Sequence, residues 1–188
     1  KDDITCTSAH GTVNFRQALA VSCNGAFGKL AREVGAENLS TTTQKVGLTK
    51  SVDVDGIKTQ AGSFTFPEDN EVNLSWAGIG QYDDQVNPCA MMVYMGAIAN
   101  GGEPVQPKLM KSSSFLSAGK SGKSLGEYIS SETADELRSM MKNNVKVTYG
   151  ESNFYGLDLY AKSGTAEVGE GQTPHAWFAG FLRNEDAP

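Results

Sequence analysis

The sequence predicts an α/β protein of the α+β kind, in which a helical region is followed by antiparallel sheet strands. Two observations lead to this prediction. Apolar residues recur at i, i+3, i+4 and i+7 from Phe27 to Val34, which is the spacing of one helix face. Near the end of the chain, residues 157–164 alternate through Leu157, Leu159 and Ala161, and a loop containing two glycines separates them from a second strand-like run over residues 175–182, as in a hairpin.

Composition limits the classes of protein to consider. The 188 residues are enough for one domain with a core, and 39% hydrophobic with 20% charged residues is typical of a globular protein. The net charge is −6 and no Lys/Arg-rich run is present, which argues against nucleic acid or an anionic membrane as the main partner. No apolar run approaches the roughly 18 to 20 residues of a membrane span. The polar opening lacks a signal peptide pattern, and we expect the chain to be cut from a longer protein.

Three helices are predicted in the first quarter of the chain. Asn14 is placed to cap a helix over residues 15–20. The periodic run over residues 25–34 forms the second helix, and residues 36–47 form a short third one. Residues 49–73 are rich in Gly, Asp, Thr and Pro without a strong period, so we expect an irregular excursion containing a short hairpin.

Two longer helices follow. Residues 87–102 form one of them, because Pro88 suits a first helical turn and Asn-Gly-Gly suits an end. Residues 131–145 form the other, with Ser131 as the predicted N-cap and with acidic residues in the first turn, as the helix dipole favours. Between them, residues 112–124 have the composition of a flexible Gly/Ser/Lys loop.

The run KSGT, residues 162–165, is the first candidate for chemistry. Alternate side chains of a strand share a face, so Lys162 and Ser163 point to opposite sides until Gly164 lets the chain leave the strand. The run offers a cation, hydroxyl donors and backbone N–H groups, which suit a carboxylate or an oxyanion forming on a carbonyl. Taken alone, the same run is more common as a solvated lysine that leads into a turn.

The second candidate is the Ser-x-Asn pattern of Ser22 and Asn24, which lies in the break between two predicted helices. Such a turn can direct both polar groups into one site, although Ser and Asn are also common helix caps. Together and in this order, the two patterns resemble the transpeptidase domain of penicillin-binding proteins, whose motifs are Ser-x-x-Lys, Ser-x-Asn and Lys-Thr/Ser-Gly. Residues 10–35, 78–109 and 161–182 are similar to the family's stretches around these motifs, and the resemblance runs from about residue 6 to residue 183.

The resemblance implies the penicillin-binding protein/serine β-lactamase-like fold and a role for each motif. Lys162 would hold positive potential, and Ser163 and Thr165 would bind the carboxylate of a D-Ala-D-Ala stem peptide or of a β-lactam. Thr165 N–H would form half of an oxyanion hole, Ser22 would relay a proton, and Asn24 would bind a substrate amide. The predicted site is therefore Ser22 and Lys162 as catalytic residues and Asn24, Ser163, Gly164 and Thr165 as substrate-binding residues.

The implied reaction is peptidoglycan cross-linking by serine acyl transfer, with no cofactor and no metal. One departure from the family pattern concerns the nucleophile, because no Ser-x-x-Lys precedes Ser22. Matches to [ST]-x-x-K, among them Thr42 to Lys45 and Ser117 to Lys120, all follow Ser22 and are in the wrong order. We therefore expect residues 1–188 to be an interior part of a transpeptidase domain that is inactive by itself.

In the intact parent, the resemblance implies a serine-type D-Ala-D-Ala transpeptidase, anchored in the bacterial membrane and facing outward. The remainder of the domain, or a strand-exchanged copy, would complete the sheet. Two alternatives stay open. One is a β-lactamase or D,D-carboxypeptidase relative with water as acceptor, and the other is a sensor or pseudoenzyme that binds a peptide or β-lactam without turnover.

The cysteines and histidines are expected to be structural. Cys6, Cys23 and Cys89 are an odd number without a C-x-x-C pair, and His10 and His175 are the only histidines. We therefore predict free, buried thiols and no structural zinc site. Asp83 and Asp84 are expected to decorate a turn.

Overall fold

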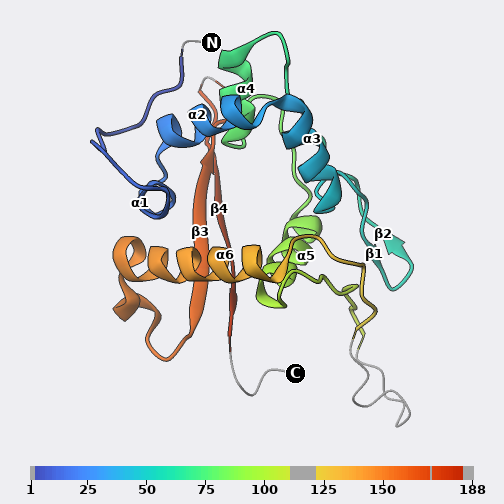
Figure 1. The fold of residues 1–188 in the computed structure, drawn as a ribbon. Coiled ribbons are helices and arrows are strands. Elements are labelled where there is room, and N and C mark those ends of the chain that lie inside the picture. The colour runs from blue at the N-terminus through green and yellow to red at the C-terminus, as the bar shows by residue number, and fades with distance from the viewer. Residues whose placement is uncertain (1–2, 111–121, 170, 184–188) are drawn as a thin grey trace.

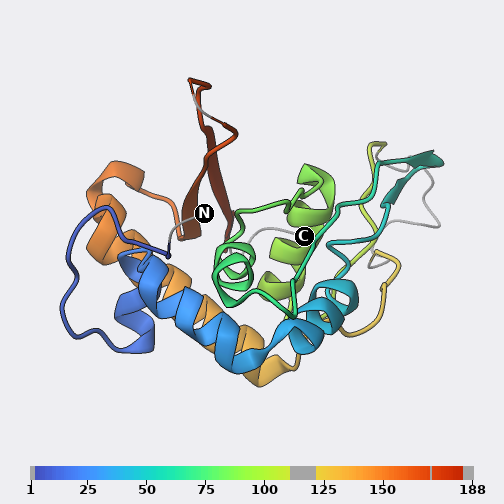
Figure 2. The ribbon, with the colours of Figure 1, turned by 90° about the horizontal axis from the view of Figure 1, so that it is seen from above.

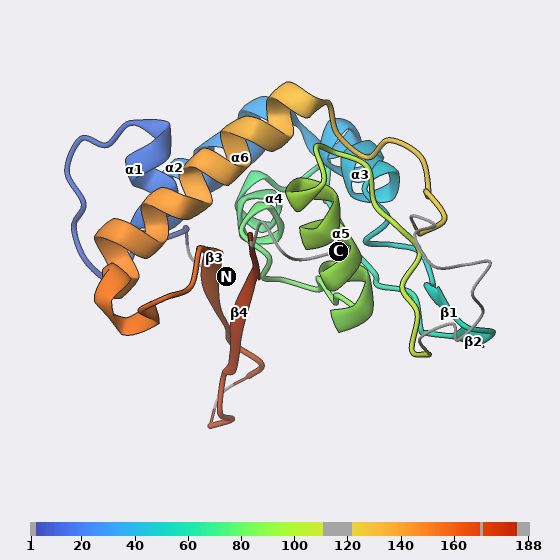
Figure 3. The same ribbon diagram turned by 90° about the horizontal axis from the view of Figure 1, so that it is seen from below.

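The computed structural model describes residues 3–110, 122–169 and 171–183, and it confirms the predicted mixture of helices and antiparallel strands (Figure 1). The helices gather on one side of a β-hairpin near the end of the chain, and the loop end of this hairpin projects away from them (Figures 2 and 3). Among the described residues, no helix combines the length and the apolar character that a membrane span requires.

The first three helices form where the sequence predicts them. They are α1 (Phe15–Ala20), α2 (Asn24–Val34) and α3 (Ala36–Lys45). Asn14 caps α1 in a capping box, because its Oδ1 accepts from Gln17 N–H at 2.9 Å and Gln17 Oε1 accepts from Asn14 N–H at 3.0 Å.

The next segment contains the short hairpin that was expected and a helix that was not. The hairpin pairs β1 (Asp53–Val54) with β2 (Ile57–Lys58). Helix α4 (Glu71–Gly78) follows, with the Asn70 side chain accepting from Asn73 N–H as its N-cap. This helix packs against α2 and carries the chain toward the turn at Gln81.

Two longer helices complete the helical part. Helix α5 (Pro88–Ala99) begins at the predicted proline, and α6 (Ser131–Asn144) continues into the π-helical η2 (Val145–Gly150) and the 3₁₀ turn η3 (Glu151–Phe154). The prediction that Ser131 caps α6 is wrong. Ser130 has the extended backbone of an N-cap and its Oγ accepts from Thr133 N–H, whereas Ser131 is already helical. Most of the predicted loop over residues 112–124 lies outside the described residues.

The hairpin near the end of the chain pairs β3 (Leu159–Ala166) with β4 (His175–Leu182) in antiparallel register. The expectation that the chain leaves the strand at Gly164 is wrong. Gly164 pairs with Trp177, and the strand continues to Ala166 because β4 offers partners along its whole length. The KSGT run therefore lies on a continuous strand.

Helix α6 packs on β3 and fixes its position. Val145, Leu159 and Ala161 form a buried cluster at this contact. Asn144, which is fully buried, donates from Nδ2 to the carbonyl oxygen of Ala161 at 3.1 Å. This bond ties the helix to the strand one residue before Lys162.

Candidate active site

Ser22 lies in the turn between α1 and α2, with an exposed side chain. Its φ of 52° is in the left-handed region, which costs free energy for a residue other than glycine. Two hydrogen bonds hold the turn around it. Cys23 N–H donates to the carbonyl oxygen of Ala18 at 2.9 Å, and Thr148 Oγ1 of η2 donates to the carbonyl oxygen of Ala20 at 2.8 Å.

Lys162 reaches this turn from β3. Its Nζ donates to Ser22 Oγ at 2.5 Å and to the carbonyl oxygen of Ser163 at 2.6 Å. Ser22 and Lys162 are 140 positions apart in the chain, so the fold brings the two motifs together, as the sequence led us to expect. Burial lowers the pKa of Lys162 from its ordinary value, because desolvation disfavours the charged ammonium. A lysine with a lowered pKa next to a hydroxyl is suited to moving a proton.

Ser163 is positioned by a tyrosine that the sequence analysis did not identify. Ser163 N–H donates to the Tyr149 hydroxyl oxygen at 2.7 Å, and the Tyr149 hydroxyl donates to Ser163 Oγ at 3.1 Å. Tyr149 belongs to η2, and its ring makes an edge contact with Phe178 of β4 at a centroid distance of 5.4 Å. No local pattern connects Tyr149 with the motif, so only the fold shows this partner.

The remaining predicted residues lie at the surface beside this pair. Gly164 and Thr165 are exposed on β3, and the carbonyl oxygen of Thr165 accepts from Gln81 Nε2 at 3.1 Å. Asn24 is the first residue of α2, and its Nδ2 donates to the carbonyl oxygen of Thr5 at 2.9 Å. The structure therefore joins Lys162 directly to Ser22, whereas Asn24 is engaged with the segment before α1.

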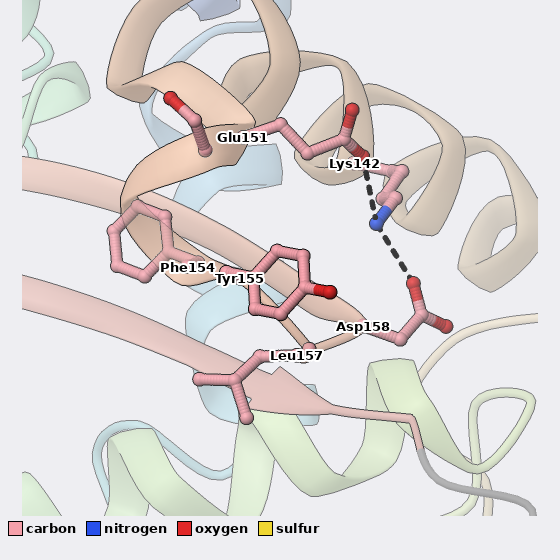
Figure 4. A pocket seen from close by; sticks show the side chains of 8 residues that line it. Lys142, Glu151, Phe154, Tyr155, Leu157 and Asp158 are labelled. Carbon is pink, nitrogen blue, oxygen red and sulfur yellow. Dashed lines mark hydrogen bonds and ion pairs between the residues drawn. The ribbon is translucent and has the colours of Figure 1, made fainter.

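A pocket of about 400 Å³ lies at the other end of β3, around η3 (Figure 4). Lys142 lines this pocket, and its Nζ lies 2.8 Å from Asp158 Oδ1 and 3.5 Å from Glu151 Oε1. None of the six predicted site residues lines this pocket. The candidate site is instead the surface where the KSGT run meets the Ser22 turn.

Three further side chains converge next to that turn. Cys6, His10 and Cys23 each place a potential metal-ligand atom within 4.8 Å of the others. The sequence predicts free, buried thiols and no zinc site. The thiols of the described cysteines are free, but only Cys23 is buried, whereas Cys6 and Cys89 are half-buried. The convergence of Cys6 and Cys23 with His10 was not predicted, because the three residues are not at the spacing of a known metal motif.

The helices packed on one side of an antiparallel hairpin, with a Lys-Ser-Gly strand against a Ser-x-Asn turn, define the fold class of penicillin-binding proteins and serine β-lactamases. Comparison with known families agrees with this class. The model of the penicillin binding protein transpeptidase domain matches residues 2–188, and the chain belongs to this family.

Two curated relatives are peptidoglycan D,D-transpeptidases named PbpA. The protein from Mycobacterium tuberculosis is 29% identical over 177 residues, which cover 90% of this chain and 36% of the relative. The protein from Mycolicibacterium smegmatis is 29% identical over 182 residues, which cover 93% of this chain and 37% of the relative. The chain thus spans little more than a third of the length of these relatives.

Solved structures show the same fold. The ceftriaxone acyl-enzyme complex of penicillin-binding protein A from M. tuberculosis superposes with a TM-score of 0.78 at 27% identity, covering 90% of this chain and 40% of that one. The D,D-transpeptidase domain of a peptidoglycan glycosyltransferase from Eggerthella lenta gives 0.74 at 25% identity, covering 93% of this chain and 46% of that one.

Proposed function

We propose that the chain is part of the transpeptidase domain of a peptidoglycan D,D-transpeptidase, which cross-links cell-wall stem peptides by serine acyl transfer and binds β-lactams. The observation that carries the proposal is the hydrogen bond from Lys162 Nζ to Ser22 Oγ. It links the second and third family motifs, and acyl transfer needs both motifs at one substrate.

In the proposed reaction, a serine hydroxyl attacks the carbonyl of a D-Ala-D-Ala peptide bond and gives up its proton, and the terminal D-Ala leaves as an amine that gains one. Ser22 and Lys162 are the groups in this chain that pass this proton. The lowered pKa of Lys162 supports the role, because proton transfer is most efficient when the pKa lies nearer the working pH. The amine of a second stem peptide then releases the acyl group as a cross-link.

The substrate-binding roles fall to the exposed part of β3 and to the start of α2. Ser163 and Thr165 bind the substrate carboxylate, and Thr165 N–H supports the oxyanion. Gly164 leaves the strand edge open for the substrate between them. Asn24 binds a substrate amide, which requires it to exchange its present bond with Thr5.

The proposal also implies where the protein is located and which strands complete its sheet. We place the site on the outer face of the bacterial cytoplasmic membrane, where stem peptides are cross-linked. Among the described residues, β3 and β4 pair only with each other, and Phe178 is 52% exposed on β4. We expect further strands of the same protein, or of a strand-exchanged copy, to cover this sheet.

The test uses the full-length protein that carries the chain and a fluorescent penicillin. The wild type should form a covalent adduct. Lys162→Ala should slow its formation by about a hundred- to a thousandfold, the usual cost of removing one preorganised electrostatic group. Lys162→Arg should fall between the two, because it keeps the charge but cannot share the proton relay.

The control is Lys58→Ala, which removes an exposed lysine from β2. This variant should react at the wild-type rate. Reversible β-lactam binding without an adduct would favour the binding-module alternative. An adduct that forms equally fast in Lys162→Ala would refute the role proposed for the KSGT run.

A further inference from the structure

The side chains of Cys6, His10 and Cys23 converge beside the Ser22 turn from two separate segments. Cys6 and His10 belong to the irregular segment before α1, and Cys23 is the N-cap residue of α2. The two sulfur atoms are 3.7 Å apart, and a ring nitrogen of His10 lies within 4.8 Å of both. Two thiols and an imidazole are the side chains that zinc prefers.

The distance between the sulfur atoms fits one bound ion. Zinc binds thiolate sulfur at about 2.3 Å in tetrahedral geometry, so two thiolates on one ion stand about 3.8 Å apart. The 3.7 Å between Cys6 Sγ and Cys23 Sγ agrees with this separation. Both cysteines are free thiols.

His10 gives a second and independent indication. Its Nε2 lies 3.2 Å from Ser8 Oγ, whereas its Nδ1 is buried and has no hydrogen-bond partner among the described residues. A buried ring nitrogen without a partner costs free energy unless something binds it. A histidine that binds a metal through one nitrogen usually makes a hydrogen bond through the other, and the Ser8 contact provides that bond.

The surroundings of the two sulfur atoms include the first turn of α2. Gly25 N–H, in the first turn of α2, donates to Cys6 Sγ at 3.4 Å. Cys23 is the N-cap residue of the same helix. Thiolate, rather than thiol, is the form that binds metal.

We propose that Cys6, His10 and Cys23 bind one zinc ion, with the fourth position open to water or another donor. The ion would link the segment before α1 to the start of α2. The hydrogen bond from Asn24 Nδ2 to the carbonyl oxygen of Thr5 already links the same two segments. Because Cys23 lies between Ser22 and Asn24, the metal would also hold the Ser-x-Asn turn. The metal site does not depend on the proposed transpeptidase function, since metal binding is measured without turnover.

The experiment measures the zinc content of the full-length protein, purified under reducing conditions, by elemental mass spectrometry. The wild type should retain one more zinc ion per chain than Cys6→Ser or His10→Ala. Replacing a direct ligand should weaken zinc binding by more than about a hundredfold, because losing an outer partner alone costs roughly 10- to 100-fold. Cobalt(II) added to the metal-free wild type should give the near-ultraviolet absorption of thiolate-to-cobalt charge transfer.

The chain offers matched controls for both ligand types. Cys89→Ser changes a free cysteine outside the cluster, and His175→Ala changes the other, exposed histidine. Both variants should keep the zinc and the cobalt spectrum. If either ligand variant fails to fold, the cobalt spectrum of the wild type decides.

Three results would overturn the proposal. The first is a wild-type protein with reduced thiols that takes up no zinc and gives no cobalt–thiolate band, since the cluster would then bind no metal. The second is full zinc retention in a folded Cys6→Ser variant. The third is a disulfide between Cys6 and Cys23 that forms again in the reduced protein even when zinc is present.

Discussion

The hydroxyl group of Tyr149 holds Ser163 at two points. It accepts from Ser163 N–H at 2.7 Å and donates to Ser163 Oγ at 3.1 Å. The ring is itself held in η2 and against Phe178, so the serine is oriented by a rigid neighbour. A hydroxyl that must bind a substrate carboxylate benefits from such orientation, because less freedom is lost on binding.

Replacing Tyr149 with Phe removes only this hydroxyl and keeps the ring contact with Phe178. We expect a loss of about 1–2 kcal/mol in stability, because Ser163 N–H loses its partner. We also expect slower β-lactam acylation, because Ser163 is no longer oriented. Tyr155→Phe is the control, since Tyr155 is 95% exposed and should show neither effect. Thermal unfolding and adduct formation by the full-length protein are the measurements, and an unchanged acylation rate in Tyr149→Phe would contradict the positioning role.

Most helices were predictable because their signals are local. Asn14 and Gln17 form a capping box within one turn, and Pro88 begins α5 because a first turn needs no N–H from that residue. The KSGT and Ser-x-Asn motifs were likewise visible as short runs. Their meeting was inferred from the family resemblance, and the hydrogen bond from Lys162 to Ser22 agrees with it.

What the sequence did not show depends on contacts between distant segments. Helix α4 was missed because its buried face includes a polar residue, Ser75. This hydroxyl accepts from Arg32 Nε of α2 at 2.6 Å, and its own proton has two acceptors in reach, the carbonyl oxygens of Glu71 at 2.9 Å and of Gly28 in α2 at 3.2 Å. Tyr149 was missed for the same reason, since a π-helical segment brings it to Ser163.

Gln81 anchors the far part of the KSGT strand, because its Nε2 donates to the carbonyl oxygen of Thr165. Gln81→Ala should lower the melting temperature by a few degrees at most, since one exposed hydrogen bond is worth about 0.5–1.5 kcal/mol. The rate of acylation should fall clearly, because Thr165 is then less well positioned, whereas the loss of stability should be small. Gln172→Ala, in the exposed hairpin loop, is the control. Equal acylation rates in the two variants would show that the Gln81 bond has no part in the site.

Two glycines of the hairpin should respond differently to the same substitution. A Cβ at Gly180 would overlap the carbonyl oxygen of Tyr160 on the paired strand, whereas a Cβ at Gly164 would make an ordinary 3.6 Å contact with Trp177. Gly180→Ala should therefore destabilise the protein by about 1–3 kcal/mol. Gly164→Ala should keep the stability but slow acylation, because the new methyl group narrows the proposed substrate edge. A Gly164→Ala variant that loses stability and acylates normally would reverse both expectations.

Asp84 should make stability depend on pH. It was expected only to decorate a turn, but its carboxyl is largely buried, and burial raises its pKa from 3.8 to about 7. Repulsion from Asp83 adds to the rise, and the hydrogen bond from Thr65 N–H opposes it. The folded state therefore binds this proton more tightly than the unfolded state, so stability falls as pH rises from about 4 to about 7 and is then constant.

Asp84→Asn removes this charge and should make the protein more stable than the wild type at pH 8, by about 1–2 kcal/mol after allowing for solvent screening. Well below pH 4, where the wild-type carboxyl is also neutral, the advantage should disappear. Asp83→Asn is the control, because Asp83 is exposed and only contributes repulsion. It should reproduce a small part of the effect. The measurement is the difference in unfolding free energy between each variant and the wild type across this pH range. A difference for Asp84→Asn that stays constant with pH would mean that Asp84 titrates in the folded protein as it does in the unfolded chain.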